Sequence, residues 1–115
     1  MKVVNKLRLA TDGSKTMFRL KYGYRIVESK FSTPDECIYI WVEQNNTKYA
    51  REQEVVFRVV RSGYPVPDSM TYTASAVDNS AMEAYHIYEK PEAELPGIHL
   101  DYYPHSKYGS EQQRA

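Results

Sequence analysis

The side chains that could do chemistry are few and widely spaced along the chain. Cys37 is the only cysteine, and it opens an apolar strand-like run, where a thiol is more typical of a buried structural residue than of a nucleophile. His86 lies in another such run, between aromatic and aliphatic neighbours, which favours a packed or hydrogen-bonded imidazole. A hydrolase needs a nucleophile, a base and an orienting group brought together. We see no such set and expect no catalytic residues.

Metal and phosphate sites are equally poorly supported by the residue types and their spacing. His99, Asp101 and His105 could ligate a metal, but they lie in a polar stretch and no fourth ligand is evident. The five glycines are scattered and form no phosphate-binding loop. We therefore expect neither a metal nor a cofactor.

Length and composition favour one small domain. The chain has 115 residues and a formal net charge of zero, which argues against strong non-specific nucleic-acid binding. One cysteine allows no internal disulfide, and neither a signal peptide nor an apolar run long enough for a bilayer is visible. We expect a soluble intracellular protein with no membrane partner.

Period-two alternation and turn residues predict an all-β, mainly antiparallel fold. The run 37–43 is apolar on both faces, which is typical of a central or covered strand. We expect a meander of about six strands that forms a small sandwich or open barrel, followed by an irregular tail. The expected strands span residues 3–9, 16–22, 37–43, 54–61, 72–77 and 82–89, with a weaker segment at 24–31.

The expected organisation is a β domain over residues 1–89 and a polar tail containing Pro and Tyr over 90–115. Within the domain, the strands at 3–9 and 16–22 flank the turn Thr11-Asp12-Gly13-Ser14 and predict an N-terminal hairpin over 3–22. Residues 24–89 then form the core of the domain.

One stretch carries a resemblance. Residues 57–67 read Phe-Arg-Val-Val-Arg-Ser-Gly-Tyr-Pro-Val-Pro, with Trp41 in an earlier strand and Tyr-His-Ile-Tyr at 85–88. This pattern resembles an uncharacterised family of short phage and prophage proteins, whose core reads Phe-Arg-Val-Val-x-Thr-Gly-His-Pro-Ile-Pro. Ser62 stands where Thr is usual and Tyr64 where His is usual, so any chemistry of that His is missing. The resemblance covers about residues 24–89 and implies a phage origin and a small β domain.

Charge is distributed unevenly along the chain. Residues 1–30 carry eight Lys and Arg against two acidic residues, whereas the remainder carries seven against thirteen. If 3–9 pairs with 16–22, one face carries Lys6, Arg8, Arg19 and Lys21. Like charges across a strand pair are destabilising, which favours binding of a compensating anion. Edge-strand protection by lysine is the alternative explanation.

These observations favour a phage-encoded, non-enzymatic binding protein that docks on a host protein with an acidic surface and inhibits it. The host bacterial cytoplasm is then the expected location. The expected contacts are in the basic strands, two tyrosines, the loop after residue 63 and the tail. They are Lys6, Arg8, Arg19, Lys21, Tyr22, Tyr24, Tyr64, Pro65, Val66 and Pro67, with tail contacts from Tyr102, Tyr103 and Tyr108.

Three other hypotheses stay open. The protein could decorate a capsid or tail and so reside in the virion, or it could sequester a small anionic nucleotide. Nucleic acid is a less favoured partner, because binding it requires a larger excess of basic residues or aromatic residues placed for base stacking. Tyr22 and Tyr24 keep this hypothesis open. The sequence does not specify the oligomeric state.

Overall fold

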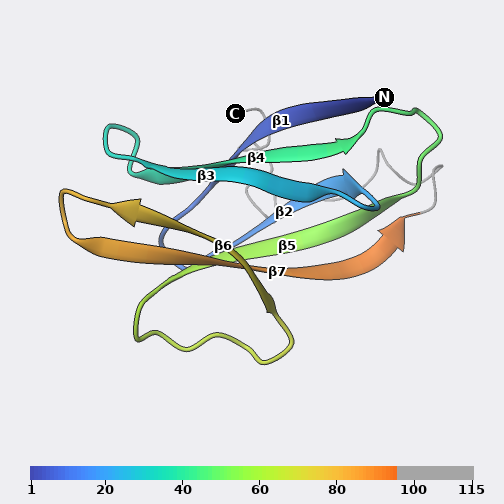
Figure 1. The fold of residues 1–115 in the computed structure, drawn as a ribbon. Helices are drawn as coiled ribbons and strands as arrows, with labels where there is room; N and C mark the ends of the chain where they lie inside the picture. The colour runs from blue at the N-terminus through green and yellow to red at the C-terminus, as the bar shows by residue number, and fades with distance from the viewer. Residues whose placement is uncertain (96–115) are drawn as a thin grey trace.

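A computed structural model describes the backbone of residues 1–95 and the side chains of residues 1–91. This part of the chain is all β, as expected, with seven antiparallel strands in two sheets (Figure 1). The strands are β1 (Lys2–Leu9), β2 (Lys15–Lys21), β3 (Arg25–Ser32), β4 (Cys37–Asn45), β5 (Glu52–Arg61), β6 (Thr71–Asp78) and β7 (Glu83–Leu95). The weak segment at 24–31 is a full strand, β3. Residues 1–95 contain no helix long and apolar enough to cross a membrane.

The two sheets form the layers of a small sandwich. One has the order β1-β4-β3 and the other has the order β2-β5-β7-β6. In Figure 1 the three-stranded sheet lies above the four-stranded one. Of the expected meander, only the β3–β4 and β6–β7 neighbours follow each other directly along the chain.

Alternation along each strand builds the core between the sheets. Aliphatic and aromatic residues at every second position point inward, and Phe18 and Phe57 meet there with ring centroids 5.9 Å apart. Every strand except β3 contributes buried residues to this core. They are Leu7, Leu9, Phe18, Leu20, Ile38, Ile40, Val42, Val55, Phe57, Val59, Ala76 and Ile87.

One side of the sandwich is closed by contacts between β3 and the four-stranded sheet. The Ser29 hydroxyl donates to the backbone carbonyl of Ser75 at 2.6 Å. Phe31 stacks on Tyr85, with centroids 5.4 Å apart and planes 4° from parallel. These contacts fix the position of the three-stranded sheet over the other.

The predicted N-terminal hairpin is wrong. β1 pairs with β4, whereas β2 pairs with β5 in the other sheet. The turn chemistry at residues 11–14 was read correctly, since Asp12 Oδ1 accepts from the Ser14 amide at 2.9 Å. That turn carries the chain from one sheet to the other, so that each of the two strands pairs with a partner distant in sequence.

The predicted boundary after residue 89 is also wrong. β7 continues to Leu95 and stays paired with β5. Pro91 lacks an N–H and lies opposite Val55, where the register shifts between Glu54 and Val55. A bulge is a site at which a strand tolerates proline.

Candidate binding surface

The outer face of β4 presents two aromatic side chains. Ile38, Ile40 and Val42 point into the core and are fully buried. Tyr39 and Trp41 alternate with them, so they point away from the core, and both are only partly buried. Because β4 is the middle strand of its sheet, these two rings lie at the centre of that sheet's outer face.

Cations from both neighbouring strands flank the two rings. Lys6 of β1 is registered with Trp41, and Arg8 of β1 and Lys30 of β3 are both registered with Tyr39. The Lys6 ammonium lies 4.2 Å from the Tyr39 ring centroid and 6.0 Å from that of Trp41, within cation–π range. We call this set, Lys6, Arg8, Lys30, Tyr39 and Trp41, the aromatic–cation face.

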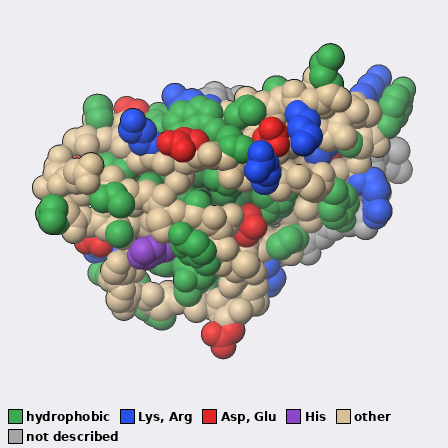
Figure 2. Space-filling model, viewed as in Figure 1, with side chains coloured by type: hydrophobic (Ala, Val, Ile, Leu, Met, Phe, Trp, Pro, Cys, Tyr) green, Lys and Arg blue, Asp and Glu red, His purple; other side chains and the backbone are tan. Residues whose placement is uncertain are grey.

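The aromatic–cation face is hollowed rather than flat. A shallow depression of about 310 Å³ is lined by Lys6, Lys30, Phe31, Ser32, Asp35, Tyr39 and Trp41. Figure 2 shows Lys and Arg side chains together with Asp and Glu side chains over the three-stranded sheet, in the upper part of the view, with hydrophobic side chains between them. A concave surface with central aromatics and surrounding charge is typical of a recognition site.

The carboxylates around the aromatic–cation face differ in their hydrogen-bond and ion-pair partners. Asp35 accepts the Tyr39 hydroxyl at 2.8 Å, which lowers the pKa of that carboxyl and raises the pKa of Tyr39 to about 12. Glu43 lies 3.0 Å from Arg25 and 3.7 Å from Lys2, and its hydrogen bond with Arg25 lowers its pKa. Glu28 is exposed and registered with Trp41, so that corner is acidic.

The structure divides the predicted basic patch between the two sheets. Lys6 and Arg8 belong to the aromatic–cation face, but Arg19 and Lys21 lie on β2 of the other sheet. Arg19 is registered with Glu54, and Lys21 forms an ion pair with Glu52 at 3.1 Å. The four cations therefore do not share a face, because the hairpin that would align them does not form.

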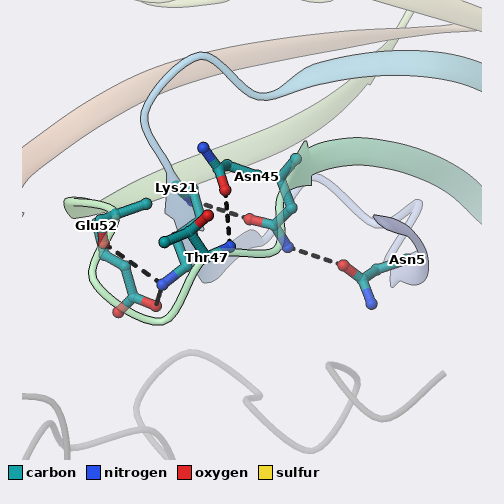
Figure 3. A network of polar contacts seen from close by, with 7 residues as sticks. Asn5, Lys21, Asn45, Thr47 and Glu52 are labelled. Atoms are coloured by element: carbon teal, nitrogen blue, oxygen red, sulfur yellow. Dashed lines mark hydrogen bonds and ion pairs between the residues drawn. The ribbon is translucent and has the colours of Figure 1, made fainter. Parts of the chain in front are cut away.

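Lys21 takes part in an internal polar network at one end of the sandwich (Figure 3). Its side chain is 16% exposed, and its ammonium also donates to the Ala50 carbonyl at 3.4 Å. Its backbone N–H donates to Gln44 Oε1 at 2.8 Å, and Gln44 in turn donates to Asn5 Oδ1 at 2.8 Å. This network ties β2 to β4 and β1, so Lys21 stabilises the join between the sheets.

The two expected tyrosine contacts differ in exposure. Tyr22 is 41% exposed, with the Arg51 guanidinium 5.1 Å from its ring centroid. Tyr24 packs against the core, and its hydroxyl donates to Glu89. Burial and the Glu89 carboxylate raise the pKa of Tyr24. Tyr22 is available for contact, whereas Tyr24 has a structural role.

The segment Tyr64-Pro65-Val66-Pro67 lies in the connection between β5 and β6, outside any strand, as its prolines predict. Tyr64 is 59% exposed, and Arg61 Nη2 donates to its hydroxyl at 3.1 Å. Figure 1 shows this connection projecting below the four-stranded sheet. The loop is therefore a surface feature separate from the aromatic–cation face.

His86 is hydrogen-bonded, as expected, in a chain whose other members the sequence did not identify. Ser62 Oγ lies 3.0 Å from His86 Nε2, and Ser75 Oγ lies 3.1 Å from His86 Nδ1. Tyr72 extends the chain, with its hydroxyl 2.8 Å from Ser75 Oγ. Both ring nitrogens of His86 are thus bonded to serine hydroxyls, whereas a catalytic triad has a carboxylate on one of them. The bond to Ser62 ties the turn after β5 to β7.

Tyr39, Trp41 and Lys30 are functional candidates that the sequence reading missed. The run 37–43 is apolar on both faces and therefore predicted a central or covered strand, but its outward side chains were not singled out. The signal was present, since aliphatic side chains occupy one parity of this run and aromatic ones the other. An exposed face with aromatic residues satisfies that pattern as well as a covered one.

Some expected sites lie outside the described residues. They are the tail contacts Tyr102, Tyr103 and Tyr108; His99, Asp101 and His105, at which no metal site was expected, lie there too. Within residues 1–91, no group of three or more His, Cys, Asp or Glu side chains is arranged to hold a metal ion. Cys37 is a buried free thiol at the start of β4, as expected.

The chain belongs to the family defined by a domain of unknown function, DUF7352, whose model matches residues 1–97. That match includes all seven strands. No curated protein and no solved structure matches the chain. A functional assignment therefore depends on the geometry of the described residues.

Proposed function

We propose that the protein is a non-enzymatic binding protein that docks on a partner protein with an acidic surface through its aromatic–cation face. One observation carries the proposal: Tyr39 and Trp41 lie side by side in the middle of a sheet face, with Lys6, Arg8 and Lys30 around them. Trp, Tyr and Arg are the residues that most often dominate binding energy in protein interfaces.

Electrostatics support an acidic partner. Three cations surround the rings, against the carboxylates of Asp35, which accepts the Tyr39 hydroxyl, and exposed Glu28, while Glu43 is paired with Arg25. Complementary charge of this kind speeds docking and selects the partner more than it adds affinity. Exposed Glu28 suits a protein partner better than a nucleic acid, because a protein can place a cation beside it whereas a phosphate backbone cannot.

The resemblance to short phage and prophage proteins supports placing the partner in a bacterial host. Docking would then inhibit the host protein by covering its surface, which requires no chemistry from the inhibitor. The exposed side chains of Tyr22 and Tyr64 lie outside the aromatic–cation face and are secondary contacts in this proposal.

Affinity capture from a bacterial lysate tests the proposal with three forms of the full chain. The double variant K6E/K30E should lose capture of the partner by roughly tenfold or more, because two attractive charges become repulsive. The double variant K15E/K48E makes the same change of charge at exposed lysines elsewhere and should capture the partner as the wild type does. Equal capture by all three forms would remove the aromatic–cation face from the proposal.

Single-stranded nucleic acid is the second candidate ligand, and the same two rings favour it. Bases stack on aromatic side chains of sheet faces that have cations along the strand. Tyr39 and Trp41 have that arrangement. Fluorescence of Trp41, the only tryptophan in the chain, distinguishes the two candidates when the protein is titrated with each ligand.

A further inference from the structure

A second site lies at the far end of β5, on the four-stranded sheet. The pairing of β2 with β5 ends at Lys15 and Arg58, whereas β7 remains paired with β5 to Arg61. Among the strands described in residues 1–95, none pairs with Val59–Arg61 on the side opposite β7. A three-residue length of sheet edge is therefore open.

This open edge forms one wall of a pocket of about 570 Å³. The turn at Thr11–Gly13 and the loop residues Tyr64 and Pro65 form other walls. Four consecutive residues of β5, from Arg58 to Arg61, line the pocket. Since successive side chains in a strand point to opposite faces, four in a row can share a pocket only where it lies along the strand edge.

Backbone groups of β5 face this pocket. The Tyr22 N–H donates to the Arg51 carbonyl at 3.0 Å, so the backbone of Arg51 faces the β2 side. The β2–β5 register has no bulge, and alternation places the backbones of Val59 and Arg61 on the same side. The Arg61 carbonyl on this side already accepts from the Tyr64 N–H at 3.1 Å. The other backbone groups on this side are the N–H and carbonyl of Val59 and the N–H of Arg61.

Two guanidinium groups frame the edge. Arg58 Nε donates to the Gly13 carbonyl at 2.9 Å, which holds its side chain against the turn. Arg61 lies beside Tyr64, with its guanidinium carbon 5.2 Å from the ring centroid. The nearby carboxylate of Asp12 is engaged by the Ser14 amide and hydroxyl, at 2.9 and 2.6 Å.

We propose that this edge binds an extended acidic segment of a partner protein, which adds to the sheet as a short strand beside Val59–Arg61. Main-chain hydrogen bonds would hold the segment, as in other cases of strand addition. Arg58 and Arg61 are three residues apart and point to opposite faces of β5, so they select two carboxylates three residues apart in the segment. That spacing also disfavours a single small anion, on which the two guanidinium groups would have to converge.

This site is independent of the aromatic–cation face and goes beyond the proposed function. The two surfaces belong to different sheets and share no residue. The variant K6E/K30E should therefore leave peptide binding unchanged, which distinguishes failure at one surface from failure at the other.

Fluorescence anisotropy of a labelled peptide, Thr-Glu-Val-Thr-Glu-Val-Thr, on the full-length protein tests the proposal. Three control peptides have glutamates two residues apart, glutamine in place of glutamate, or an N-methyl group on the valine between the glutamates. Each control should bind about tenfold more weakly or worse, since each removes a charge-assisted or main-chain hydrogen bond.

Protein variants complete the test. Arg61→Gln should weaken binding of the parent peptide about tenfold, because one guanidinium–carboxylate contact is lost. Lys48→Gln removes the same charge from the loop at the opposite end of β5 and should have no effect. Circular dichroism checks that both variants keep the fold.

Each of the following results would overturn the proposal. The N-methylated or respaced peptide could bind as tightly as the parent, or Arg61→Gln could leave binding unchanged. The parent peptide could also fail to bind a folded protein. Sedimentation analysis tests whether a second copy of the chain occupies the edge. A dimer that Arg61→Gln dissociates would assign the edge to that second copy and overturn the proposal.

Discussion

Tyr39 combines two properties at the residue scale. Its ring lies beneath the Lys6 ammonium, at 4.2 Å, and its hydroxyl donates to Asp35. The Asp35 bond holds the ring in place, and the charges of Arg8 and Lys6 help to lower the pKa of the Asp35 carboxyl. An ordered aromatic side chain loses less conformational entropy on binding, which favours affinity.

The Tyr39–Asp35 bond gives a pH dependence with a defined sign. The bond raises the pKa of Tyr39 to about 12 and lowers that of Asp35 below 3.8. A raised tyrosine pKa stabilises the fold below pH 10 and loses this effect as pH rises through the folded value. A lowered aspartate pKa stabilises the fold above pH 3.8 and loses its effect as pH falls through the folded value. The bond therefore contributes between these limits.

NMR titration of the tyrosine ring carbons checks this dependence. Tyr39, assigned by its loss in Tyr39→Phe, should ionise near pH 12, and in Asp35→Asn it should ionise closer to pH 10 because the acceptor charge is gone. Asp12→Asn is the control, since Asp12 bonds Ser14 and not Tyr39. An unchanged Tyr39 titration in Asp35→Asn would contradict the assigned cause.

At the element scale, several turns between strands contain a residue with a positive φ angle. Gly63 has φ of +90° and follows Ser62 in a turn closed by the bond from the Tyr64 N–H to the Arg61 carbonyl. Glycine adopts this conformation without strain, whereas a side chain rarely does. This turn places Tyr64 beside Arg61 and positions one wall of the β5 pocket.

Replacement of Gly63 tests the role of that turn. Gly63→Ala should lower the free energy of unfolding by about 1 kcal/mol, because the left-handed conformation strains a side chain. Gly63→Asn is the matched control and should recover most of the loss, since asparagine tolerates that conformation. Urea denaturation of the three proteins measures both effects. Equal stability of all three would show that the turn adapts without cost.

The strands themselves were largely predictable from the sequence, and their partners were not. Alternation and turn residues are local properties, so β1, β2, β4, β5 and β6 were found near their observed bounds. The choice of partner depends on burial between residues far apart, which is why the expected hairpin of β1 and β2 failed. The continuation of β7 through Pro91 depended on a bulge, which the sequence does not reveal.

The candidate site shows the same division. Lys6 and Arg8 were expected on an outward face, and they lie on one. The placement of Arg19 and Lys21 on the same face was wrong, because β2 belongs to the other sheet. A central position for β4 was among the expectations, but Tyr39 and Trp41 become candidates only when the sandwich shows their side chains partly exposed and flanked by cations.

At the scale of the whole molecule, the two proposed binding surfaces lie on different sheets of one sandwich. The buried residues between them hold the layers together, and the Lys21 network ties them at one end. The outer face of the three-stranded sheet is then a rigid support for the aromatic–cation face. A preformed surface suits the proposed docking role.

Fluorescence of Trp41, during titration with the partner captured from lysate, tests the central claim most directly. Trp41 is the only tryptophan in the chain and lies within the proposed interface, so it reports binding without a label when the partner's own emission is subtracted. The expected result is emission at shorter wavelength and weaker quenching by acrylamide, with no such change on titration with single-stranded DNA. A partner that binds by anisotropy but leaves the emission and quenching of Trp41 unchanged would contradict the claim.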